Sequence, residues 1–109
     1  MLNSSTPNLL LDDALFPGVL DGSITASIRI GDRKIEPGRM TFAATNGNYL
    51  PLTVFVSSVI KTTLIGIADV HARRAGHGSD EAAMAWLREK YPEANPDTPM
   101  TVILFERAY

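Results

Sequence analysis

The chain has 109 residues, of which 45% are hydrophobic and 20% are charged, as expected for one folded domain and not for a disordered segment. Its net charge is −2 and it contains no cysteine. This excludes disulfide bonds and thiolate metal sites and argues against generic binding of polyanions. We therefore expect a single domain over residues 1–109.

No segment of the sequence has the length and apolar character of a membrane span. The longest apolar run, residues 50–60, is interrupted by Pro51 and by hydroxyl side chains. The N-terminus lacks the basic start and the apolar stretch of a signal peptide. These observations predict a cytoplasmic protein without a membrane partner.

The N-terminal part of the chain divides into a polar lead-in and an apolar segment. Residues 1–8 are polar and are expected to be a disordered lead-in. The apolar residues of segment 8–22 suit a short helix, with the aspartate pair at 12–13 near its N-terminal end. Because Pro17-Gly18 is unfavourable inside a helix, two short turns are the alternative. Gly22 is the predicted stop.

Residues 24–30 alternate between apolar and polar side chains and predict a strand with two different faces. A turn over residues 31–34 and another at Pro37-Gly38 lead to a second predicted strand, residues 39–44. Asn46-Gly47-Asn48 is a strong hairpin signal, so a third, long strand is expected over residues 49–61.

The hydrophobic period then changes to that of helices. Residues 63–74 are compatible with a helix, and Ser79 is the expected N-cap of a second one, which Pro92 closes. Residues 100–105 predict a last strand. Several short strands in a chain of this size are expected to curl into a partly open β-barrel flanked by helices, so the fold class is α+β.

The polar face of the first predicted strand is the leading candidate for a binding site. Thr25, Ser27 and Arg29 are spaced two apart and would present two hydroxyls and a guanidinium on one surface. Such a set can donate several hydrogen bonds to a phosphate or to a base edge. A solvated outer strand face would give the same pattern, and the sequence leaves this alternative open.

Basic residues are concentrated in the middle of the chain. Residues 22–74 hold seven Lys or Arg against three Asp or Glu, which can form an anion-binding site or a scattered, solvated surface. Within this segment we expect Arg39 and Lys61 to contact a ligand phosphate. Tyr49, beside the hairpin turn, is the candidate for stacking on a base, whereas Trp86 and Tyr91 lie at helical spacing and are interpreted as core residues.

Signatures of metal, cofactor or hydrolase sites are lacking in the sequence. His71 and His77 are six residues apart, which is not a metal-ligand spacing. Neither the glycines of a nucleophile elbow nor a glycine-rich phosphate loop is present. We therefore predict no metal and no cofactor.

Several segments, taken in order, resemble ASCH domains of the PUA-like superfamily. Residues 20–29, Leu-Asp-Gly-Ser-Ile-Thr-Ala-Ser-Ile-Arg, resemble the family's G-x-K-T-x-T-x-R segment, and residues 37–39 resemble its P-G-D turn. Residues 72–92 are similar to its E-G-F-x-S-x-E…L…Y-P stretch, and residues 102–106 to its closing strand. The resemblance covers residues 14–107 and implies a PUA-like barrel whose helices flank a cleft.

The resemblance also implies work on RNA or nucleotides, either as binding or as hydrolysis of acylated cytidine or single-stranded RNA. The family's lysine falls on Ile24, its glutamate on Ala75 and its turn aspartate on Arg39, whereas Ser27 conservatively replaces a threonine and Arg29 is retained. Isoleucine and alanine cannot activate a nucleophile or transfer protons.

Three hypotheses of function remain open at this point. The first is an RNA- or nucleotide-binding domain without the catalytic groups. The second is a diverged hydrolase using Ser27 and Lys61, with Tyr49 as a further candidate. The third is a module that binds a protein partner and retains only the fold.

Overall fold

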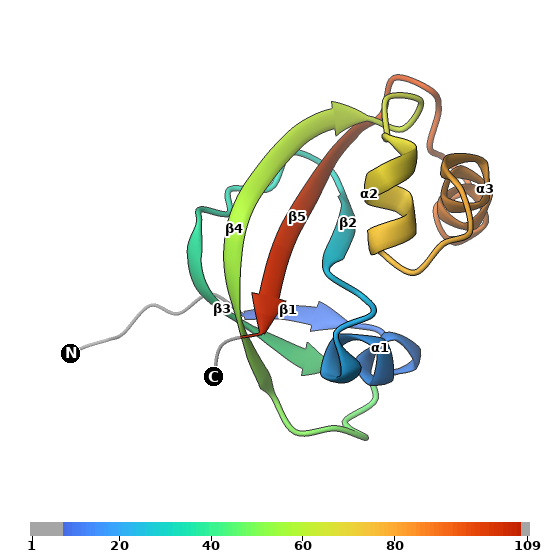
Figure 1. The fold of residues 1–109 in the computed structure, drawn as a ribbon. Helices are drawn as coiled ribbons and strands as arrows, with labels where there is room; N and C mark the ends of the chain where they lie inside the picture. Colours follow the sequence, from blue (N-terminus) through green and yellow to red (C-terminus); the bar gives the residue numbers. More distant parts are fainter. Residues whose placement is uncertain (1–7, 108–109) are drawn as a thin grey trace.

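The computed structural model describes residues 8–107, so the expected lead-in lies outside the described residues except for Asn8, which begins a strand. Five strands form one sheet in the order β1-β3-β4-β5-β2, in which β1 is parallel to β3 and the other neighbours are antiparallel. Figure 1 shows this sheet curling into a half-barrel. The predicted α+β, partly open barrel is confirmed. The strands are β1 (Asn8–Leu11), β2 (Ala26–Ile30), β3 (Gly38–Ala44), β4 (Leu52–Thr63) and β5 (Pro99–Arg107).

Three short helices accompany the sheet, namely α1 (Phe16–Asp21), α2 (Asp69–Arg74) and α3 (Asp80–Lys90), and a 3-10 turn η1 (Asp13–Leu15) precedes α1. α2 lies beside β2 and α3 packs on the outer side of α2, whereas α1 lies at the opposite end of the half-barrel (Figure 1). Among residues 8–107, no helix has the length and apolar character needed to cross a membrane.

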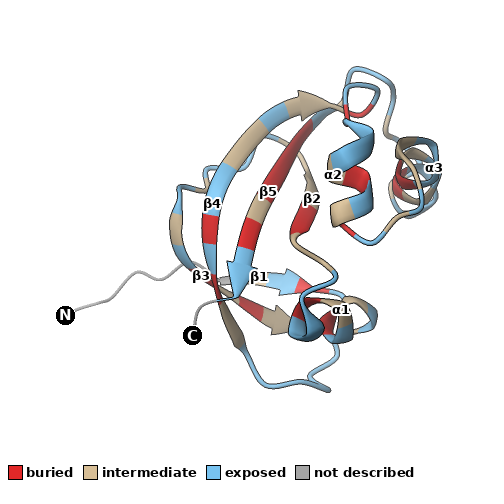
Figure 2. Cartoon of the chain, in the orientation of Figure 1, coloured by how far each residue is buried: buried red, intermediate tan, exposed pale blue. Residues whose placement is uncertain are grey.

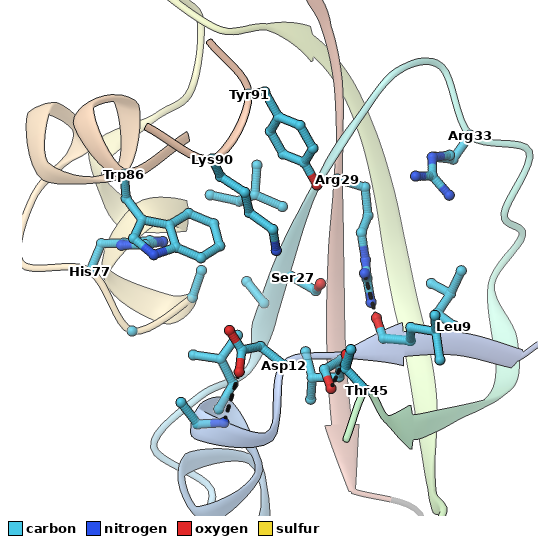
Figure 3. Close-up of a pocket in the computed structure, with 18 residues that line it drawn as sticks. Leu9, Asp12, Ser27, Arg29, Arg33, Thr45, His77, Trp86, Lys90 and Tyr91 are labelled. Atoms are coloured by element: carbon cyan, nitrogen blue, oxygen red, sulfur yellow. Dashed lines mark hydrogen bonds between the residues drawn. The ribbon is translucent and has the colours of Figure 1, made fainter. Parts of the chain in front are cut away.

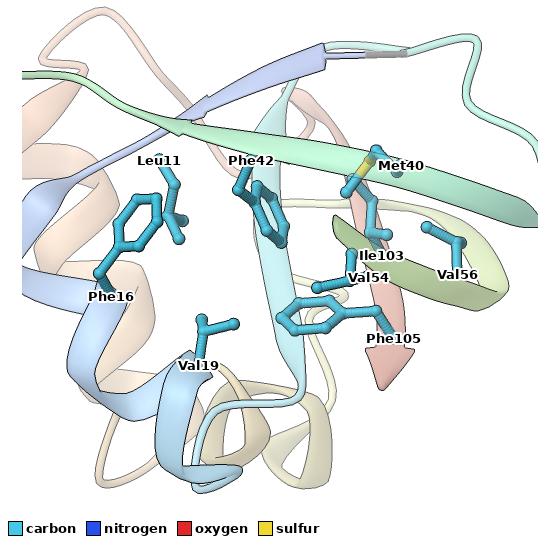
Figure 4. Packing of buried hydrophobic residues seen from close by; sticks show 9 residues of the cluster. All are labelled: Leu11, Phe16, Val19, Met40, Phe42, Val54, Val56, Ile103 and Phe105. Carbon is cyan, nitrogen blue, oxygen red and sulfur yellow. The ribbon is translucent and has the colours of Figure 1, made fainter. Parts of the chain in front are cut away.

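The concave side of the half-barrel holds the first of two hydrophobic clusters. Phe42 of β3 and Phe105 of β5 meet edge to face, with ring centroids 5.1 Å apart, and Phe16 and Val19 of α1 close the end of the barrel over them (Figure 4). Figure 2 shows the buried stretches of β3, β4 and β5 on which this packing depends. The first cluster consists of Leu11, Phe16, Val19, Met40, Phe42, Val54, Val56, Ile103 and Phe105.

The second cluster lies between the sheet and the pair of helices α2 and α3. Leu87 of α3 and Ala72 of α2 are buried against Met100 of β5, and Ile28 and Ile30 of β2 pack at its edge. Both faces of β2 are therefore covered, since its apolar face meets the helices and its polar face turns toward the concave side. The interpretation of that polar face as a solvated outer surface is excluded, because Ser27 is only 7% exposed.

A β-bulge between Val56 and Ser58 interrupts the alternation of β4. Val56 pairs with Phe105 and Ser58 with Leu104, so Ser57 is the extra residue. Val54 and Val56 point into the first cluster, and after the bulge Val59 packs against the same cluster. The bulge therefore keeps the apolar side of a long, bent strand turned inward, as bulges in curved sheets do.

The N-terminal apolar segment was predicted to be a helix, and this prediction is wrong for residues 8–11. These residues form β1, which pairs with β3 from Asn8–Thr41 to Leu11–Ala44. The alternative of short turns holds for the rest, because η1 and α1 follow and Pro17 occupies the first turn of α1, where its missing N–H is not needed. Gly22 ends α1 with φ = 86°, as predicted.

The predicted helix over residues 63–74 is confirmed only from Asp69 onward. The amides of Leu64 and Ile65 donate to the carbonyls of Thr98 and Pro96, so this segment is tied to the loop before β5 and cannot continue as a helix. The Ser79 cap is confirmed, since its hydroxyl accepts a 3.0 Å hydrogen bond from the amide of Ala82.

Candidate ligand-binding cleft

A cleft of 740 Å³ opens between the N-terminal segment, β2 and α3. Its volume is within the range of small-molecule sites in proteins. β2 forms the floor, and side chains from two regions of the chain face each other across it (Figure 3). One wall comes from residues 9–12, 14–15 and Thr45, and the other from His77, Trp86, Lys90 and Tyr91.

Hydrogen bonds to the β3–β4 hairpin hold the N-terminal wall in place. The amide and hydroxyl of Thr45 both donate to the carbonyl of Leu11, and the carboxylate of Asp13 accepts from the amides of Asn46 and Asn48 at 2.9 and 3.1 Å. These bonds lower the pKa of Asp13, first of all the one from Asn46. The hairpin turn and the cleft wall are therefore one connected unit.

Ser27 and Arg29 place polar groups on the floor of the cleft. They pair with Ile103 and Thr101 of β5, and the period of two turns both side chains to the concave side. The Arg29 guanidinium lies 5.8 Å from the centroid of the Phe42 ring, and its Nη1 donates a 2.6 Å hydrogen bond to the carbonyl of Leu10. Since β1 and β2 are the two edges of the sheet, Arg29 bridges the opening of the half-barrel.

The Nε and Nη2 groups of Arg29 are buried and have no hydrogen-bond partner within residues 8–107. Burial, and next the positive charge of Arg33, lower the pKa of Arg29 to about 10. The guanidinium therefore stays charged at neutral pH while two of its donor groups are unsatisfied, which is a rare arrangement in native proteins.

The α3 wall combines rings and a cation. The ammonium of Lys90 lies 4.8 Å from the centroid of the Trp86 ring and 5.8 Å from that of Tyr91, and the imidazole of His77 is tilted against Trp86 at 5.3 Å. Trp86 and Tyr91 also pack against the second cluster. Their prediction as core residues is therefore incomplete, because both line the cleft as well.

Positive charge exceeds negative charge in the cleft. Arg29, Arg33 and Lys90 line it together with one carboxylate, Asp12, which accepts a hydrogen bond from the amide of Ala14. None of the three cations forms an ion pair with a carboxylate in the part of the chain that the structure describes. In a chain with a net charge of −2, this local excess favours anions in the cleft.

The partly buried imidazole of His77 predicts that the stability of the fold depends on pH. Burial lowers the pKa of its imidazole below the ordinary value of 6.5, so the unfolded chain binds a proton more readily than the folded one. The free energy of unfolding should therefore fall as the pH is lowered from about 7.5 to 5.5. Urea unfolding over this range tests the prediction.

The matched variant for this test is His77→Gln, which cannot take up a proton. Its stability should change less with pH over the same range, since the aspartates with lowered pKa values have an ordinary value of 3.8 and act only at lower pH. Equal slopes for the two proteins would assign the effect to another group.

Thr25 does not share the cleft with Ser27 and Arg29. It precedes β2 and lines a smaller hollow of 350 Å³, and its hydroxyl accepts a 2.8 Å hydrogen bond from Nε of Arg74. The three polar residues that were expected on one surface are thus divided, and only Ser27 and Arg29 lie together in the cleft.

The other three predicted ligand contacts lie outside the cleft. Arg39 is exposed on β3, where it pairs with Phe55 of β4. Tyr49 stacks on Phe16 with ring centroids 5.0 Å apart. Lys61 forms an exposed ion pair with Asp32 at 2.7 Å and donates to the carbonyl of Arg33. The structure thus separates Lys61 from Ser27, its partner in the hydrolase hypothesis.

The positions matched to the family's lysine and glutamate line two different hollows. Ala75 is buried and lines the cleft, whereas Ile24 lines the smaller hollow and packs against the first cluster. Within residues 8–107, no group of three His, Asp or Glu side chains is arranged to hold a metal ion.

No protein-family model matches the sequence, and no curated protein does. Solved structures are similar to it in fold. A DUF984-family protein from Enterococcus faecalis superposes with a TM-score of 0.72 and 16% identity, covering 98% of this chain and 83% of that one. An ASCH domain from Lactobacillus crispatus superposes with a TM-score of 0.66 and 16% identity, covering 87% of this chain and 70% of that one. An ASCH protein from Zymomonas mobilis superposes with a TM-score of 0.63 and 14% identity, covering 91% of this chain and 66% of that one.

These identities are too low to carry over an activity, but the superpositions extend over nearly the whole chain. They confirm the resemblance deduced from the short sequence motifs as far as it concerns structure. The chain has the fold of ASCH domains.

Proposed function

We propose that the cleft binds RNA or a nucleotide, without the catalytic groups needed to hydrolyse it. The observation that carries this proposal is the buried guanidinium of Arg29, which keeps its charge beside the cleft. Its Nε and Nη2 have no hydrogen-bond partner among the residues that the structure describes. Phosphate and carboxylate oxygens are the acceptors that a guanidinium binds most strongly, and a base carbonyl is a further acceptor. A cytoplasmic location, where these ligands occur, is part of the proposal.

The surroundings of Arg29 support an anionic ligand with a planar ring. Arg33 and Lys90 add positive charge, and Trp86 and Tyr91 add aromatic surface on which a base can stack. Because Nε and Nη2 are also covered from solvent, a ligand oxygen reaches them only when the guanidinium rotates toward the cleft. That rotation would exchange the Leu10 carbonyl for the ligand.

The residues matched to the family's catalytic groups favour binding over hydrolysis. Ile24 and Ala75 have no group that can activate a nucleophile or transfer a proton. Lys61, the candidate replacement, is held by Asp32 outside the cleft. Ser27 remains as a hydroxyl on the cleft floor, where it can donate or accept a hydrogen bond to a ligand.

Titration of a labelled single-stranded RNA, read by fluorescence anisotropy at several salt concentrations, tests this function. Binding should weaken with salt, with a slope of log K against log salt near about −2 when all three cleft cations contact phosphates, since each contact contributes about −0.7. Arg33→Gln should remove one such contact and make the slope less negative by about 0.7.

Arg39→Gln and Lys61→Gln are the matched controls, because each removes one exposed positive charge outside the cleft. Both should bind RNA with nearly the wild-type slope. A larger effect of either control than of Arg33→Gln would place the binding surface elsewhere. The same samples on a denaturing gel should contain intact RNA, and cleaved RNA would instead support the hydrolase hypothesis. If the titration detects no binding, a protein partner is the remaining alternative.

A further inference from the structure

The pairing of Trp86 with Lys90 indicates what kind of ligand the cleft accepts. The two residues are four apart on α3, so they lie on the same face of the helix. The ammonium of Lys90 sits 4.8 Å from the centroid of the Trp86 ring, and Figure 3 shows it directed into the cleft, above the floor at Ser27. The lysine thus occupies the place where a planar ligand would stack.

Lys90 is held there only weakly. Its side chain is exposed, and its ammonium has no carboxylate partner among residues 8–107. An exposed cation over a ring is among the weaker interactions in proteins, whereas stacking of a base on an aromatic side chain is generally stronger. A base can therefore displace the ammonium from the ring.

The displaced ammonium then needs an anion nearby. Lys90 has a long, flexible side chain with three donors, and the cleft that it enters already contains the guanidinium groups of Arg29 and Arg33. A phosphate attached to the stacked base through its sugar would meet all three cations. A ligand without a phosphate would displace the Lys90 ammonium from the Trp86 ring without providing an anion for it to bind.

We propose that the cleft selects a phosphorylated nucleotide unit over the free nucleoside, with its base stacked on Trp86 in place of the Lys90 ammonium and its phosphate bound by that ammonium together with Arg29 and Arg33. This inference rests on the proposed function. The same unit occurs as a free nucleoside monophosphate and as one residue of single-stranded RNA. The cleft volume of 740 Å³ accommodates a ligand of this size.

Trp86 is the only tryptophan of the chain, so its fluorescence reports on this site without labelling. We would titrate the protein with adenosine and cytidine, with their 5′-monophosphates, and with short single-stranded RNAs of the same bases. The monophosphates should quench Trp86 and bind about tenfold or more tightly than the nucleosides, as expected for an added charge-assisted contact. Comparison with the short RNAs distinguishes a free nucleotide from an RNA as the preferred source.

Lys90→Gln is the variant that tests the exchange. It should weaken the binding of the monophosphates about tenfold and leave that of the nucleosides unchanged or slightly tighter, so that the selectivity is lost. Arg88→Gln removes an exposed charge of the same helix that does not line the cleft, and it should bind all ligands as the wild type does.

Failure of this inference is distinguishable from failure of the proposed function. If RNA binds in an Arg33-dependent manner but Trp86 emission does not respond, or if nucleosides bind as tightly as monophosphates, the Trp86–Lys90 exchange is wrong and the binding function stands. If no ligand binds, or if the cleft variants bind as tightly as the wild type, both the proposed function and the Trp86–Lys90 exchange are wrong.

Discussion

Arg29→Met is expected to weaken RNA or nucleotide binding at least about 100-fold while leaving the folded domain as stable as the wild type. Hydrogen bonds to charged groups contribute about 1.5–3 kcal/mol each, and about 2.8 kcal/mol corresponds to a factor of 100 in affinity. Methionine keeps an unbranched, apolar stem at this position but is shorter than arginine, and it removes the cation that lies over the Phe42 ring.

The expected effect on stability has a different origin. Arg29 has two buried donors without a partner in the described part of the chain, and each such group costs about 1–3 kcal/mol. The substitution removes both of them and leaves only one group, the Leu10 carbonyl, without its donor. The free energy of unfolding should therefore be equal to or above that of the wild type.

Urea unfolding and ligand titration of the same Arg29→Met preparation test both parts. Lys61→Met, which removes a cation outside the cleft, is the control and should retain binding. If Arg29→Met instead destabilises the domain by several kcal/mol, Arg29 acts mainly by joining the two edges of the half-barrel, and its proposed role in binding would lose its chief support.

Phe42→Ala is expected to be the most destabilising single substitution, lowering the free energy of unfolding by about 3–5 kcal/mol. Phe42 is fully buried in the first cluster, where its ring meets Phe105 edge to face at 5.1 Å and lies beneath the guanidinium of Arg29. Alanine would leave a cavity at the centre of the concave face. Since small domains are stable by about 5–15 kcal/mol, a large part of the stability would be lost.

Phe55→Ala provides the control on the neighbouring strand β4. Phe55 is 46% exposed and alternates with the buried Val54 and Val56, so the same change of residue removes little buried surface. We expect a loss below about 1 kcal/mol, within the range of strand propensities. Similar losses for the two variants would show that the concave face is not the core on which the fold depends.

Local patterns predicted most elements, because their causes lie within a few residues. The alternation of residues 24–30 predicted β2, the Asn46-Gly47-Asn48 signal predicted the hairpin between β3 and β4, and the Ser79 hydroxyl caps α3 as expected. The short motifs that resemble ASCH domains predicted a fold that the superpositions confirm. None of these required knowledge of contacts between distant residues.

The errors arise where a distant partner determines the structure. Residues 8–11 have an apolar pattern that suits a helix or a strand, and pairing with β3, about thirty residues later in the chain, makes them β1. In β4, the bulge at Ser57 shifts the inward-facing residues by one position, which no strict alternation can predict. Residues 64–65 leave the predicted helix because they bond to the loop before β5.

The composition of the cleft is likewise a tertiary property. Strand alternation placed Ser27 and Arg29 on one face, but only the curvature of the sheet turned that face inward. Trp86 and Lys90 are separated from Arg29 by more than fifty residues of sequence, and they meet it across the cleft because α3 packs on α2, which lies beside β2. Their spacing of four on a predicted helix was visible in advance, yet nothing local indicates which helix face borders a cavity.

The sequence by itself therefore determined the α+β class, the fold family that its motifs resemble, and the chemical character of the β2 face. These depend on side-chain periodicity, turn residues and caps, which act over a few positions. The tertiary structure alone decided that Tyr49, Arg39 and Lys61 lie outside the cleft and that Trp86, Lys90 and Arg33 line it. The physical reason is that burial and charge proximity depend on how the sheet curves and where the helices pack, and these follow from contacts between residues far apart in the chain.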